Sequence, residues 1–73
     1  MTWYSAIDPS GSEHTFSTPD LDMWAVFVDE DEHGWVLAAQ YFTETDALND
    51  MDSRIAAGLD VDYVYVSKTS ALR

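Results

Sequence analysis

The stretch WAVFVDEDEHGWVLAAQYF, residues 24–42, decides the fold. It contains two apolar runs, at 24–29 and 35–42, rich in the β-branched and aromatic residues that are typical of strands. The five residues between them, EDEHG, have the length of a hairpin loop and place a glycine near its end. Both runs are apolar on both faces, which favours central positions in a sheet. We therefore predict an antiparallel hairpin.

A helix is predicted directly after this hairpin, over residues 43–57. Thr43 is a suitable N-cap, acids follow in the first turn, and Gly58 is placed as a left-handed stop. The apolar stripe at helical spacing consists of Ala47, Leu48, Met51 and Ile55. The opposite face consists of Asp46, Asn49, Asp50 and Ser53. Asp50 precedes Arg54 by four residues, which predicts an exposed ion pair.

The N-terminal third supplies further strands. Residues 2–7 (TWYSAI) predict a first strand, residues 8–11 (DPSG) a turn, and residues 13–17 a short second strand. The tripeptide Thr18-Pro19-Asp20 has the cap, the proline and the acid of a helix start, which leaves room for one turn before the strand at 24.

The last strand is predicted over residues 61–67 (VDYVYVS), followed by a short, partly basic tail. The resulting fold class is α+β, with a single domain over residues 1–73. We expect a small antiparallel sheet of three to five strands, in the order β-β-β-α-β, with one helix packed on one face.

This sheet is apolar on both faces, and one helix covers only one of them. Within the last strand Tyr63 and Tyr65 point opposite to Val64 and Val66, so valines under the helix would turn the tyrosines outward. Two coverings of the second face remain open. Either the N-terminal segment folds across it, or it meets a partner protein or a second copy in a homodimer.

Composition limits the classes of function. The chain has 73 residues, 47% of them hydrophobic and 14% aromatic, which argues against disorder. It has no cysteine, so we expect a reducing compartment and a cytoplasmic protein. No apolar run approaches the ~18 residues of a membrane span, and residues 1–8 lack the pattern of a signal peptide, so no membrane partner is expected.

The charge is the one functional clue. The net charge is −11, and residues 1–53 contain 12 acids and no Lys or Arg. Because phosphate contacts need Lys and Arg, direct binding of nucleic acid is close to excluded. Charge of this size is a property that concerns partners and solubility rather than fold.

No motif names an enzymatic chemistry. His14 and His33 are expected to be exposed loop histidines beside acids, and the serines show no nucleophile-elbow pattern. The cluster DEDEH at 29–33 does not have the ligand spacing of a calcium loop. We therefore expect no enzyme activity, no cofactor and no dedicated metal site.

The acids are interpreted as a surface for a basic protein. Carboxylates two residues apart on an extended strand are about 6.6 Å apart, the same order as the spacing of phosphates. A basic groove built for DNA or RNA would be attracted to such a surface and occupied by it. Trp24, Trp35 and Tyr41 would supply aromatic anchors. The candidate partner-binding residues are Asp29, Glu30, Asp31, Glu32, Asp46, Asp50, Asp52, Trp35, Tyr63 and Tyr65.

In size and charge the chain resembles the small acidic inhibitors that phages make against CRISPR complexes or restriction enzymes. That resemblance implies a nucleic-acid mimic that blocks the basic surface of a nucleic-acid-handling complex. Two alternatives remain open. The chain could be an acidic adaptor or subunit of a larger assembly, or its acids could be an adaptation of the surface to concentrated salt.

Overall fold

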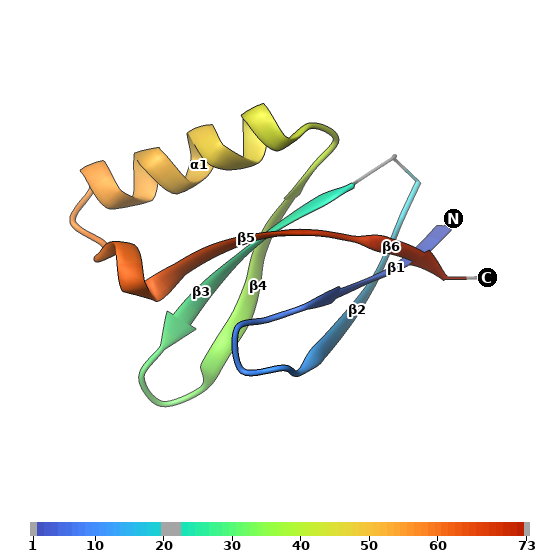
Figure 1. Cartoon of the computed structure of the whole chain (residues 1–73), viewed down its shortest axis with the longest axis horizontal. Helices are drawn as coiled ribbons and strands as arrows, with labels where there is room; N and C mark the ends of the chain where they lie inside the picture. The colour runs from blue at the N-terminus through green and yellow to red at the C-terminus, as the bar shows by residue number, and fades with distance from the viewer. Residues whose placement is uncertain (1, 20–22, 73) are drawn as a thin grey trace.

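The hairpin predicted at 24–42 lies in the middle of the computed structural model, which describes residues 2–19 and 23–72 (Figure 1). Along the chain the elements are β1 (Thr2–Ile7), β2 (Glu13–Thr18), β3 (Trp24–Glu30), β4 (Gly34–Tyr41), α1 (Glu44–Ala56), the 3₁₀ turn η1 (Val61–Tyr63), β5 (Val64–Lys68) and β6 (Ser70–Leu72). The α+β class is confirmed. Within the described residues the strands form two antiparallel sheets, β2-β1-β6 and β4-β3-β5, here called the β1 sheet and the β3 sheet.

A β-bulge in β4 explains why this segment is apolar on both faces. Phe27 pairs with Leu37 and Val26 pairs with Ala39, so Ala38 is an extra residue. The extra residue lets Leu37 share the face of Phe27 while Ala39 shares the face of Val26. The prediction of central positions is confirmed for β3 and wrong for β4, which is an edge strand with both faces partly covered.

The helix packs on one face of the β3 sheet, as predicted. Thr43 caps it by accepting a hydrogen bond from the backbone N–H of Asp46 (3.2 Å), and Gly58 follows with a φ of +113°. Ala47 is fully buried in a cluster with Val26 and Val64. The members of the predicted stripe that pack there are Ala47, Met51 and Ile55. Leu48 is 38% exposed, because its position is turned away from the sheet.

The C-terminal third departs most from the sequence prediction. Asp60 accepts a hydrogen bond from the N–H of Asp62 (3.0 Å) and thereby starts η1, so residues 61–63 are not part of a strand. Val64 and Val66 then lie under the helix, which is the arrangement that turns Tyr65 outward. The predicted tail contains β6, which pairs with β1. Thr69, between β5 and β6, donates its N–H to the carbonyl of Met23 (2.8 Å). β5 and β6 are separated by this one residue, and they belong to the β3 sheet and the β1 sheet respectively.

The N-terminal hairpin folds across the face of the β3 sheet opposite the helix. Ala6 joins Ala25 and Phe27 in a buried cluster, with Trp35 and Leu37 packed against it. The His14 ring lies on Phe27, with 4.8 Å between ring centroids. Of the two coverings left open, the N-terminal segment is therefore present, although it leaves Tyr65 41% exposed.

Residues 18–20 do not begin a helix where the structure describes them. Thr18 is the last residue of β2, paired with Thr2, because the β1 hairpin extends through it. Asp20 lies outside the described residues.

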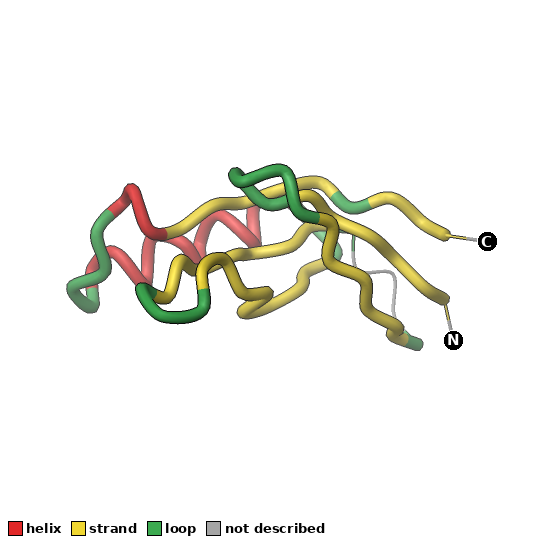
Figure 2. The backbone as a smooth tube through the Cα atoms, turned by 90° about the horizontal axis from the view of Figure 1, so that it is seen from below, coloured by secondary structure: helices red, strands yellow, loops and turns green. Residues whose placement is uncertain are grey.

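The molecule is thin, with extents of 36 × 25 × 14 Å, and Figure 2 shows it edge-on. A thin molecule encloses few large side chains, and among the described residues Phe27 and Val26 are the largest that are fully buried. The β3–β4 turn and η1 lie toward one end of the long axis, whereas β6 and the start of β1 lie toward the other (Figures 1 and 2).

Candidate functional site: an acidic end beside an aromatic pair

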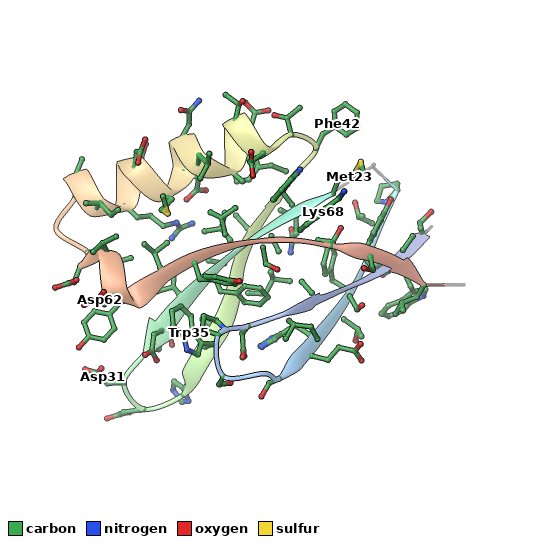
Figure 3. The ribbon with its side chains drawn as sticks, viewed as in Figure 1. Met23, Asp31, Trp35, Phe42, Asp62 and Lys68 are labelled. Atoms are coloured by element: carbon green, nitrogen blue, oxygen red, sulfur yellow. The ribbon has the colours of Figure 1, made fainter. Side chains whose placement is uncertain are left out.

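Six acids gather at the end of the molecule formed by the β3–β4 turn and η1. We call this group the acidic end, and it consists of Asp29, Glu30, Asp31, Glu32, Asp60 and Asp62. η1 contacts β3, and Figure 3 shows Asp31 and Asp62 at the same end. Asp29 is half-buried and the other five are exposed. The sequence prediction did not select Asp60 and Asp62: it placed Asp62 in the strand at 61–67 and Asp60 in no element. The Asp-x-Asp spacing of an Asx turn was the available signal.

Among residues 2–19 and 23–72, the carboxylates of Asp29 to Glu32 form no salt bridge. The salt bridges among residues 2–19 and 23–72 are Arg54–Asp50 and His14–Asp8, neither of them at this end. Lys68 lies near Met23 and Phe42, away from Asp31 and Asp62 (Figure 3). The negative potential at the acidic end is therefore not neutralised by the described part of the chain.

One predicted aromatic anchor, Trp35, meets the candidate partner-binding residue Tyr65 beside these acids. Trp35 pairs directly with Asp29 across the hairpin, and its ring contacts that of Tyr65 edge-on, with centroids 6.4 Å apart. Tyr63, in η1, is 42% exposed. Trp24 and Tyr41 are instead partly buried against the cluster under the helix, and they pair at the end of the β3–β4 hairpin opposite the turn, so they do not lie beside these acids. A partly exposed aromatic pair next to unpaired carboxylates suits a guanidinium or ammonium group, through charge and through the ring faces.

The geometry of the turn limits the phosphate analogy. Asp31 and Glu32 lie in the turn itself, where His33 donates its N–H to the carbonyl of Glu30 (2.9 Å). The extended-strand spacing of about 6.6 Å therefore does not continue through the cluster, since the chain reverses there. The carboxylates of the acidic end therefore form a compact cluster around the turn rather than a linear row.

The helix acids are not brought together with the acidic end, and they do not share one face. Asp46 and Asp50 are four residues apart and line an open depression with Tyr41, Asn49, Ser53, Arg54 and Ala57. Asp52 is about 200° around the helix from Asp50 and is exposed on another face.

Asp50 is not a free surface carboxylate. It is half-buried and accepts hydrogen bonds from the Tyr41 hydroxyl and from Nε of Arg54. Partial burial raises its pKa, but the hydrogen bonds from Arg54 and Tyr41 outweigh that effect and leave the pKa below its ordinary value. The hydrogen bond to Asp50 raises the pKa of the Tyr41 hydroxyl. The pair of Asp50 and Arg54, predicted to be exposed, is thus partly buried, and through Tyr41 it links α1 to β4. The charge of Arg54 is paired with that of Asp50.

A second polar cluster closes the β1–β2 hairpin, and the sequence did not indicate it. Asp8 is 5% exposed and accepts hydrogen bonds from the Ser10 hydroxyl (2.6 Å), from the N–H groups of Ser10 (2.9 Å) and Ser12 (3.1 Å), and from His14 Nε2 (2.6 Å). The hydrogen bond from the Ser10 hydroxyl lowers the pKa of Asp8, and burial raises it. The hydrogen bonds from His14 and from the N–H groups of Ser12 and Ser10 lower the pKa further, so that it falls to about 2. His14 is therefore a half-buried strand residue, contrary to the expected exposed loop position.

This cluster has the residue types of a hydrolase but not their connection. Both the Ser10 hydroxyl and His14 donate to Asp8, which lies between them. Activation of a serine requires a hydrogen bond from its hydroxyl to the base. Within the described residues the Ser10 hydroxyl donates to Asp8 and not to His14, so the serine–histidine hydrogen bond of a hydrolase is not made there and the hydrogen bonds hold the turn in place.

Lowering the pH is expected to test the Asp8 cluster. Because the pKa of Asp8 is about 2 in the folded protein and ordinarily 3.8, its contribution to stability is complete above pH 4 and is lost as the pH falls toward 2. Protonation of the other acids relieves repulsion and acts in the opposite direction, so a comparison is needed. The urea midpoint should fall more steeply between pH 4 and 2 in the parent protein than in Asp8→Asn. Exposed Asp52→Asn is the control and should follow the parent; parallel curves for all three would contradict this role.

Neither a metal cluster nor a membrane helix is found in residues 2–19 and 23–72. No group of three or more His, Asp or Glu side chains there is placed to hold a metal ion. No helix in the same residues has the length and apolar character needed to cross a membrane. Comparison with protein-family models, with curated proteins and with solved structures gives no match to this chain.

Proposed function

We propose that the protein is a small acidic inhibitor that binds the basic surface of a nucleic-acid-handling protein through its acidic end. The observation that supports this best is the coincidence, at one end, of unpaired carboxylates with the Trp35–Tyr65 pair. The acids attract a basic partner over a long range, and the aromatic rings offer apolar contact that acids lack. No turnover or cofactor enters this function.

The acidic end is a better contact than the helix. Asp50 already has two partners, and Asp46 and Asp52 lie on different faces. A basic groove approaching the acidic end meets the carboxylates of Glu30, Asp31 and Glu32 without breaking an internal ion pair. Charge complementarity of this kind speeds encounter and weakens as salt rises.

The experiment compares two variants of equal charge. Glu30→Gln/Asp31→Asn/Glu32→Gln removes three of the six charges of the acidic end, and Glu44→Gln/Asp46→Asn/Asp52→Asn removes three of the four acidic charges of the helix; each variant carries −8 instead of −11. Both are immobilised and used to capture proteins from a lysate, with washes at ~0.15 and ~0.5 M salt. We expect the capture of a nucleic-acid-binding protein, which added DNA displaces from the beads. The Kd for this captured protein should rise ~10-fold or more in the first variant and much less in the second.

The outcomes separate the proposal from its alternatives. Equal loss in the two variants would remove the acidic end as the contact. A captured partner that DNA does not displace would favour the adaptor interpretation. Absence of any captured partner, together with thermal stability that rises into molar salt, would favour adaptation to salt.

A further inference from the structure

The outward face of the β1 sheet carries an apolar strip that no described element covers. Along β1, Tyr4 and Ala6 are buried and Ala6 faces the β3 sheet, so Trp3, Ser5 and Ile7 point the other way. Leu72 of β6 pairs with Trp3 and lies beside it on the same face. Trp3 is 53% exposed, Ile7 46% and Leu72 40%, with the small Ser5 between the first two.

This face is almost without charge in a protein whose net charge is −11. Glu13 is the only Asp, Glu, Lys or Arg among the residues of β1, β2 and β6. The acidic end lies toward the end of the long axis opposite β6 and the start of β1, and the β1–β2 turn lies between the two ends (Figures 1 and 3). The side chains of the outward face in β2 and β6 are Glu13, Thr15, Ser17, Ser70 and Leu72.

That distribution favours a second copy of this chain as the occupant. Two copies meeting through the acidic end would bring carboxylates together, at a cost that rises as water is excluded. Two copies meeting through the β1 sheet keep those carboxylates far apart and bury Trp3, the type of residue most often found at interface hot spots. A basic partner, by contrast, has no electrostatic reason to bind a neutral face.

We propose that the protein forms a two-fold symmetric dimer through the outward face of the β1 sheet. Such an interface is self-complementary, so an axis near Ser5 sets Trp3 of one copy against Ile7 of its partner. Ser5 leaves room for this contact because its side chain is small and buried between the two larger ones. Tyr63 and Tyr65 are then available to another protein, whereas the sequence had left open a homodimer through their face of the sheet.

The salt dependence distinguishes this dimer from the proposed inhibitor complex. The dimer buries few charges, so its main electrostatic term is repulsion between two acidic molecules, which salt screens. Added salt therefore strengthens the dimer and weakens binding of a basic partner. Failure of one proposal leaves the other standing, since the two contacts lie on different surfaces.

Sedimentation velocity of the purified chain, at ~1 to ~500 µM in ~0.05 and ~0.5 M NaCl, tests the dimer. We expect a monomer–dimer equilibrium with a lower Kd at high salt. Trp3→Ser and Ile7→Gln should each raise Kd ~10-fold or more, whereas the matched surface variant Tyr65→Ser should leave it unchanged. Circular dichroism confirms that each variant is folded. A monomer at every concentration in ~0.5 M salt, or a dimer broken by Tyr65→Ser and not by Trp3→Ser or Ile7→Gln, would overturn the proposal.

Discussion

Replacing Phe27 with alanine is expected to leave much of the protein unfolded at 25 °C. The side chain is fully buried between the β3 sheet and the N-terminal hairpin, where it contacts the His14 ring. Truncating a buried Phe costs about 3–5 kcal/mol, because apolar contact is lost and a cavity remains. A chain of 73 residues has about 4–11 kcal/mol of stability in total. The effect is large because a molecule this thin has few other large buried side chains.

Urea unfolding followed by near-ultraviolet circular dichroism measures this loss. Tyr65→Ala is the matched control, since Tyr65 pairs directly with Phe27 across the strands but is 41% exposed. We expect the control to lose much less stability. Equal losses in the two variants would mean that the cluster around Phe27 is not the main core on that face.

Placing a carboxylate at Ala47 is expected to detach the helix from the sheet. Ala47 is fully buried against Val26 and Val64, so the side chain of Ala47→Asp has no partner and no access to water. An unpaired buried charge costs several kcal/mol. The position lies near the helix N-terminus, where an acid is locally favourable, so helix propensity does not account for the loss.

Thr45→Asp gives the same net charge in the same turn at an exposed position. Its free energy of unfolding should stay within ~0.5 kcal/mol of the parent value. Far-ultraviolet circular dichroism with urea titration compares the two variants. If Ala47→Asp were as stable as Thr45→Asp, the helix would not be held by the contact with Val26 and Val64.

The sequence predicted those parts of the fold that local patterns encode. The cap at Thr43, the stop at Gly58 and the turn closed by Gly11 all follow from residue type and were correct. The bulge at Ala38 has no local signature, because it is set by which side chains of β4 meet Val26 and Phe27. β6 was missed since three residues form a strand only when β1 is beside them.

The candidate site divides in the same way. The sequence indicated Asp29 to Glu32 because they are four consecutive acids, and it indicated Trp35 because this residue follows them closely in the chain. The contact between Trp35 and Tyr65 joins residues thirty positions apart and needed the fold. Asp50 was misjudged because the hydroxyl that binds it comes from β4, not from its own helix.

The bulge in β4 also determines how this strand tolerates changes of length. Ala38 is the residue without a partner, so loss of one alanine from the Ala38–Ala39 pair would still leave Leu37 opposite Phe27 and an alanine opposite Val26. Loss of a residue elsewhere in β4 would instead shift the register by one residue, and the side chains beyond that point would turn to the opposite face of the sheet. Within this strand the alanine pair is therefore the place where deletion of one residue is least disruptive during evolution.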